Sequence, residues 1–278
     1  MAGLTMTTPS VHVLRASVGV VERLRTAPRE AGRVHSVFER ALNIDWHDGR
    51  LLTLQSPGPL LAPFAATLAR LPRSCAIVPG LPMWRRGDVL TLDGVVLDPR
   101  GTAAIDPTMP EARTSPGSVF AVLPTAPSVA KGLASEIGCR ARSRLADGVS
   151  RRDPGAFIQG ALGLIGLGEG LTPAGDDCLV GALAALRRFT PSWLDAHPEI
   201  RTTVEQTAAV ATTTVAHEFV AHALAGRFAE SLVDLLTADS ADEIRCAATR
   251  LLGSGATSGA DTLCGVELAL AALRNRTS

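Results

Sequence analysis

Residues 166–181 read GLGEGLTPAGDDCLVG, and residues 253–265 read GSGATSGADTLCG. Both stretches end in the pattern G-x-D-x-L-x-G, and both carry a glycine-rich segment with a threonine before it. Glycine-rich turns directly before a helix are typical of sites for small charged ligands, because backbone N–H groups converge there. The repeated pattern therefore predicts two related loop–helix sites in one chain.

The residues that follow each pattern are expected to be helical. Apolar side chains at helical spacing predict a helix over residues 177–188, and residues 261–274 are expected to close the chain as another helix. Four more helices are expected in this half of the chain, at residues 127–145, 200–224 (one long helix), 228–236 and 241–252. Gly253 is expected to end the last of them. Residues 125–278 are thus predicted to form a helical domain that carries both motifs.

The chain before Pro124 has the pattern of short strands. Asp48-Gly49 and Asp93-Gly94 each separate two apolar runs, which is the signature of a tight hairpin. Residues 11–24 suit a strand or a short helix equally. A helix is expected at residues 60–71, and further strands at 75–78 and 119–123. The predicted class is α+β, with a mostly antiparallel β-rich module over residues 1–124 followed by a helical array.

The composition argues against several classes of partner. The 278 residues hold 27 basic and 27 acidic side chains, and this zero net charge does not favour nucleic acid or an anionic membrane as a partner. No long unbroken apolar run and no charged, apolar leader are visible, so neither a membrane span nor a secretory signal is expected. The five cysteines are scattered without a C-x-x-C pair, which indicates neither a disulfide framework nor a zinc site. A cytoplasmic protein is expected.

The first motif does not match the common nucleotide-binding patterns. A dinucleotide fingerprint starting at Gly166 would need a glycine at position 171, which is Leu171. Gly170 and Gly175 have the spacing of a P-loop, but Asp176-Asp177 follow in place of Lys and Ser or Thr. No nucleotide cofactor is therefore expected. The acidic loop instead suits a divalent cation such as Mg²⁺, or the cationic or amide end of a ligand.

Ten residues of the two motifs are the candidate site. The catalytic candidates are Asp176, Asp177 and Asp261. The simpler interpretation is that these aspartates only cap the starts of helices. If the motifs form one site, Asp177 and Asp261 are expected within about 10 Å of each other across a pocket. The substrate-binding candidates are the glycines and hydroxyls of both loops, namely Gly168, Gly170, Thr172, Gly175, Thr257, Ser258 and Gly259.

Residues 166–181 closely resemble the hallmark of the AllH-type family, which is associated with the oxamate carbamoyltransferase of anaerobic allantoin breakdown. Residues 255–263 resemble its C-terminal motif and residues 35–41 its N-terminal landmark, so that the resemblance spans nearly the whole chain. The chain departs from the family pattern at Ala174, Ala256 and Ala260, where the family often has serine, histidine and an aromatic residue.

The resemblance implies carbamoyl transfer between carbamoyl phosphate and oxamate, in purine catabolism, by an enzyme with several subunits. Other subunits and a small carboxylate or carbamoyl phosphate are thus the implied partners. A non-catalytic subunit that binds a small acid or acts as a scaffold is the alternative, because Ala256 replaces the histidine. A metal-dependent phosphate-handling enzyme that uses the three aspartates is a second alternative. The candidates for holding a substrate carboxylate are Arg140, Arg151 and Arg152.

Overall fold

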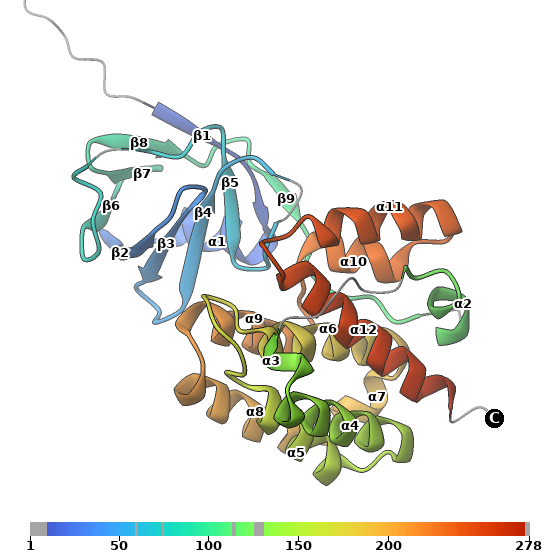
Figure 1. The fold of residues 1–278 in the computed structure, drawn as a ribbon. Helices are drawn as coiled ribbons and strands as arrows, with labels where there is room; N and C mark the ends of the chain where they lie inside the picture. Colours follow the sequence, from blue (N-terminus) through green and yellow to red (C-terminus); the bar gives the residue numbers. More distant parts are fainter. Residues whose placement is uncertain (1–9, 59–60, 74, 113–114, 125–130, 276–278) are drawn as a thin grey trace, which may run out of the picture. The chain divides into compact units, whose positions relative to one another are not determined.

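The computed structural model describes residues 10–58, 61–73, 75–112, 115–124 and 131–275. The chain divides into two compact units, Met1–Pro107 and Thr108–Ser278. The predicted α+β class is confirmed, because the first unit holds the strands and a single helix of the described residues, whereas the second is an array of helices (Figure 1).

The first unit is built on one sheet that closes on itself. Its strands follow the order β5-β4-β3-β2-β6-β7-β8-β1-β9, and β1 also pairs with β5. Most pairs are antiparallel, and the parallel ones are β4–β5, β1–β8 and β1–β9. The elements are β1 (Ser10–Ser17), α1 (Val18–Thr26), β2 (Glu30–Val37), β3 (Ala41–Trp46), β4 (Leu51–Gln55), β5 (Ala65–Leu68), β6 (Pro82–Arg86), β7 (Val89–Leu92), β8 (Val95–Asp98) and β9 (Ala103–Ile105).

Both predicted hairpins are confirmed. Gly49 and Gly94 have positive φ angles of 78° and 71°, which a tight turn between antiparallel strands requires and glycine adopts at little cost. They join β3 to β4 and β7 to β8. Residues 11–24, which suited either a strand or a helix, contain the end-to-end junction of β1 and α1.

Three local predictions in this half of the chain are wrong. Residue 60 lies outside the described residues, and residues 61–71 contain the strand β5 rather than a helix, because its buried residues pair with β4 on one side and β1 on the other. Backbone pairing in the closed sheet thus overrides the helix preference of the alanines. Residues 75–78 include a turn and no strand. Residues 119–123 overlap the short helix α2 (Pro116–Phe120), which starts at a proline.

Among its described residues, the second unit contains α2 and ten further helices. They are α3 (Lys131–Ala134), α4 (Glu136–Arg151), α5 (Pro154–Leu164), α6 (Ala174–Phe189), α7 (Pro191–Asp195), α8 (Pro198–Ala211), α9 (Thr214–Leu224), α10 (Glu230–Thr237), α11 (Ala241–Leu252) and α12 (Ser258–Arg274). Residues 127–130 of the expected first helix lie outside the described residues, and its remainder is α3 and α4. Among the described helices, none has the length and apolar character needed to cross a bilayer.

The single long helix expected over residues 200–224 is wrong, because the chain breaks it into α8 and α9. Thr212 and Thr213 form the junction, and both side chains are engaged there. The Thr213 hydroxyl accepts from the Ala216 N–H and so caps α9, while the Thr212 hydroxyl donates to Asp176. The junction between α8 and α9 therefore contacts the first motif through Thr212.

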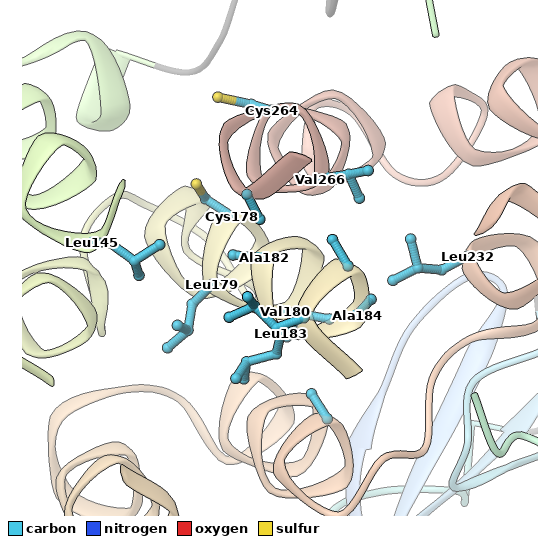
Figure 2. Close-up of a cluster of buried hydrophobic side chains, with 14 of the residues drawn as sticks. Leu145, Cys178, Leu179, Val180, Ala182, Leu183, Ala184, Leu232, Cys264 and Val266 are labelled. Carbon is cyan, nitrogen blue, oxygen red and sulfur yellow. The ribbon is translucent and has the colours of Figure 1, made fainter. Parts of the chain in front are cut away.

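Helix α6 is the centre of the second unit. Every residue from Ala174 to Leu186 is buried, so this helix has no solvent face. Figure 2 shows its side chains pointing in different directions, toward Leu145 of α4 on one side and Leu232 of α10 on another. Helix α12 runs against it and is buried continuously from Gly259 to Val266.

Two glycines bring the backbones of α6 and α12 into direct contact. A Cβ atom added to Gly181 would lie 2.0 Å from the carbonyl oxygen of Thr262, and one added to Gly265 would lie 1.8 Å from that of Cys178. Gly181 and Gly265 are the last positions of the two motifs, and Cys178 and Thr262 are also equivalent. The two copies of the motif therefore pack against each other in a symmetric manner.

We expect Gly181→Ala to lower the free energy of unfolding by about 3 kcal/mol or more, because the added methyl group forces two helix backbones apart. Denaturant unfolding followed by circular dichroism measures this loss. Gly117→Ala in α2 is the control, since its Cβ would meet only the Ser115 hydroxyl at 3.8 Å. Equal stability of the two variants would contradict the close helix contact.

Candidate functional site

The loop between α5 and α6 carries the glycine-rich part of the first motif. Gly166, Gly168 and Gly170 all have positive φ angles, of 71°, 124° and 97°. A side chain at Gly166 would collide with the carbonyl oxygen of Ala211, at 2.2 Å, whereas nothing lies within 4 Å of the Gly170 position. Gly168 and Gly170 are exposed, so this part of the loop faces solvent.

Gly175 and Gly259, the first positions of the two motifs, have equivalent structural roles. A Cβ at either residue would lie 2.0 Å from a carbonyl oxygen of the preceding helix, that of Leu164 or Leu251. The Gly175 N–H donates to Leu167 and the Gly259 N–H to Ser254. The N–H groups at both helix starts are thus bonded within the chain, and they leave no open N–H cradle at these two positions.

The aspartates do not cap the helices. The residues preceding α6 and α12 are Pro173 and Thr257, and neither forms a side-chain cap hydrogen bond. Asp177 and Asp261 each lie one turn inside their helix, four residues before Gly181 and Gly265. Residues four apart share a face of a helix, so the glycine contact turns both aspartates toward the helix interface.

The two motifs meet in one cluster, which we call the acid cluster and define as Asp177, Asp261, Thr172 and Ser258. The hydroxyls of Thr172 and Ser258 are hydrogen-bonded at 2.8 Å although they are 86 residues apart in the sequence. Both hydroxyls also interact with the carboxyl group of Asp177, and the charge of Asp261 acts on the same group. Thr172 and Ser258 are half-buried, whereas the two carboxyl groups are buried.

Burial determines the electrostatics of the acid cluster. Asp177 is 8% exposed and Asp261 is fully buried. Burial, with the charges of Asp261 and Asp176 added, raises the pKa of Asp177 well above its usual range, although the two hydroxyls oppose the shift. Asp177 Oδ2 is buried and has no hydrogen-bond partner among the described residues, and the same is true of Asp176 Oδ1. A buried carboxylate oxygen in this state is a position where a ligand can supply the missing donor.

Asp176 has a different environment from Asp177. Its Oδ2 accepts hydrogen bonds from the Gly166 N–H at 3.1 Å and from the Thr212 hydroxyl at 2.7 Å. Burial raises its pKa to about 6 in spite of these two bonds. Asp176 thus ties the glycine loop to the α8–α9 junction. Thr212 and Gly166 were not among the candidates from sequence, and the run of β-branched, hydroxyl-bearing residues Thr212–Thr214 is the one local signal that could have indicated a helix break there.

The remaining candidates lie outside the acid cluster. Thr257 is exposed, and its carbonyl oxygen accepts from the Asp261 N–H. Arg140 forms an exposed ion pair with Glu136, and Arg151 and Arg152 are exposed at the end of α4. In the described part of the chain, no group of three or more His, Cys, Asp or Glu side chains is arranged to hold a metal ion.

Two protein-family models match the chain. A family model described as oxamate carbamoyltransferase subunit AllH matches residues 164–270, which include both motifs, and the AllH family N-terminal domain matches residues 12–105. The chain belongs to the AllH family. An oxamate carbamoyltransferase subunit implies other subunits in a complex. Searches of curated proteins and of solved structures found no match.

The raised pKa of Asp176 makes a prediction about stability. Between about pH 4 and pH 6 the folded AllH chain binds more protons at Asp176 than the unfolded chain does, so this residue's contribution falls as the pH rises through that window. We expect the stability of the wild type relative to Asp176→Asn to fall by at most about 3 kcal/mol from pH 4 to pH 7. Urea unfolding at several pH values measures the difference.

The exposed Asp242, which pairs with Arg245 on the surface, provides the control variant Asp242→Asn. Its stability difference from the wild type should show no fall in the same window. A stability difference for Asp176→Asn that is constant with pH would show that the Asp176 pKa is not raised.

Proposed function

We propose that this chain is a subunit of a cytoplasmic oxamate carbamoyltransferase-like enzyme that transfers a carbamoyl group between carbamoyl phosphate and oxamate, in the breakdown of allantoin. Membership of the AllH family supports the enzyme class. The observation that carries the proposal is the hydrogen bond between Thr172 and Ser258 over the buried Asp177, because it joins the two motifs in one chemical site.

Asp177 is the general base of the proposed reaction. The amide nitrogen of oxamate attacks the carbamoyl carbon, the bond to the phosphate oxygen breaks, and the nitrogen loses a proton to the Asp177 carboxylate. An oxygen of Asp177 without a partner suits an N–H donor of the substrate. Because burial raises the pKa of Asp177, its ionised form is a stronger base than an ordinary aspartate.

The other members of the acid cluster assist Asp177. The negative charge of Asp261 raises the pKa of Asp177 further and so increases its basicity. Thr172 and Ser258 lie at the half-buried side of the cluster, next to the exposed loop residues Gly170 and Thr257. Their hydroxyls can donate to the carbonyl or carboxylate oxygens of the substrates.

The negative phosphate group needs a cationic partner, which the acid cluster does not contain. The N–H groups of Gly175 and Gly259 bind carbonyl oxygens of the chain itself. Asp176, Asp177 and Asp261 do not form a metal-holding group in the described structure, so no step of the proposal involves Mg²⁺. We infer that a partner subunit supplies the cationic group for the phosphate, which is consistent with a subunit family.

We expect Asp177→Asn to reduce turnover of the assembled complex by roughly 100-fold or more, because an amide cannot accept the proton. Turnover is measured as release of phosphate from carbamoyl phosphate in the presence of oxamate, with circular dichroism as the check of folding. The control Asp242→Asn changes an exposed aspartate of the same unit and should keep full turnover. Unchanged turnover in Asp177→Asn would exclude this residue as the base.

The pairing of the two motifs has its own prediction. Turnover should rise with pH as Asp177 loses its proton, and Asp261→Asn should move this acidic limb to lower pH because a negative neighbour is removed. The measurement is the pH profile of kcat for both complexes. A limb that stays in place, or moves to higher pH, would contradict the coupling of the two aspartates.

The same complexes test the alternative of a non-catalytic, acid-binding subunit. Calorimetry with oxamate and with carbamoyl phosphate measures binding by the isolated chain, and the turnover assay measures catalysis by the complex. Binding to the isolated chain, together with full turnover in Asp177→Asn, would favour the acid-binding subunit over the proposed catalytic one.

A further inference from the structure

Three of the five cysteines meet around one arginine, and we call Cys139, Cys178, Cys264 and Arg142 the thiol cluster. Arg142 of α4 places Nη1 3.7 Å from the sulfur of Cys264 on α12 and Nη2 3.5 Å from the sulfur of Cys139 on α4. Cys178 of α6 is hydrogen-bonded to Cys264, and Figure 2 shows these two on the neighbouring helices. All five cysteines are free thiols.

The members of the thiol cluster differ in charge. The hydrogen bond from Cys178 and the positive charge of Arg142 lower the pKa of Cys264 to about 7, against the effect of burial. The same hydrogen bond, with burial, raises the pKa of Cys178 well above its usual range. Cys178 therefore stays protonated and donates a hydrogen bond to the Cys264 sulfur. The positive charge of Arg142 stabilises the negative charge of the Cys264 thiolate.

Cys139 is the exposed cysteine of the thiol cluster. Cys264 is 7% exposed and Cys178 is fully buried, whereas Cys139 is exposed near the start of α4. A small neutral oxidant can reach a thiolate beside an exposed thiol. The two outer nitrogens of one guanidinium contact the Cys139 and Cys264 sulfurs, so the two sulfurs lie around the same side chain.

We propose that Cys264 is a peroxide-reactive modification site that forms a disulfide with Cys139. This inference goes beyond carbamoyl transfer and does not depend on it. The substrate of the modification is hydrogen peroxide or a small hydroperoxide, and the reactive group is the thiolate held by Arg142.

The chemistry proceeds in two steps. The Cys264 thiolate attacks one oxygen of hydrogen peroxide, the O–O bond breaks, and hydroxide leaves, so that sulfur is oxidised to a sulfenic acid and peroxide is reduced. The Cys139 sulfur then attacks the sulfenic sulfur, and the S–O bond breaks. The displaced hydroxide takes the Cys139 thiol proton and leaves as water.

The disulfide would link α4 to α12 next to the acid cluster. Cys264 lies three residues after Asp261, on the part of α12 that is buried against α6. A covalent link at this position would restrain the second motif. Oxidation by peroxide would thereby restrict the movement of Asp261, which lies on the same helix.

Peptide mapping by mass spectrometry tests the proposal on the full chain treated with hydrogen peroxide. We expect a Cys139–Cys264 cross-linked peptide that dithiothreitol removes. In Cys139→Ser, dimedone should instead label Cys264 as the sulfenic acid. The control Cys246→Ser removes an exposed cysteine outside the cluster and should leave the cross-link unchanged. A Cys178–Cys264 link, or no dimedone label on Cys264, would overturn the proposal.

The role of Arg142 is measured by the rate at which iodoacetamide alkylates Cys264 at pH 7. Arg142→Gln should slow this rate roughly 3- to 10-fold, because the thiolate loses its positive neighbour. Arg250→Gln is the matched control, since Arg250 Nη1 lies 3.3 Å from the sulfur of Cys246 and both residues are on α11. Equal Cys264 rates in the wild type and Arg142→Gln, with both folded by circular dichroism, would contradict the thiolate site.

Discussion

The contact between the backbones of α6 and α12 is the constraint on which the rest of the helical unit depends. It exists because Gly181 and Gly265 have no Cβ and each faces a carbonyl oxygen of the other helix. This approach places the equivalent aspartates, one turn earlier, at the same interface. It also explains why both motifs end in glycine, since any side chain at these positions would separate the two halves of the acid cluster. The chemistry of the cluster is thus a consequence of a packing requirement.

The adjacent aspartates Asp176 and Asp177 lie in different surroundings. Asp176 has two hydrogen-bond donors and connects the glycine loop to the α8–α9 junction, which is a structural task. Asp177 interacts with two hydroxyls and with the charge of a second carboxylate, and its pKa is raised well above the usual range, which is typical of the environment of a reactive group. Adjacent residues of the same type thus have different environments, because a helix directs neighbouring side chains about 100° apart.

The same helix pair carries a second set of reactive groups. Cys178 directly follows Asp177, and Cys264 lies one turn after Asp261, so the thiols and the carboxyls belong to the same two segments. They differ in the charge that faces them, because Arg142 reaches the cysteines from α4. A positive neighbour stabilises a thiolate, whereas burial beside negative neighbours keeps a carboxyl protonated to higher pH.

The sequence by itself determined the α+β class, the two hairpins at Asp-Gly, and the two related loop–helix motifs, because turn chemistry and helical spacing are local properties. It also carried the family resemblance that the family models confirm. Only the tertiary structure decided that residues 65–68 are a strand, that the helix is interrupted at Thr212, and that the side chains of Thr172 and Ser258 are in contact. Each of these depends on a partner far away in the sequence, and no local pattern records which distant residues will come into contact.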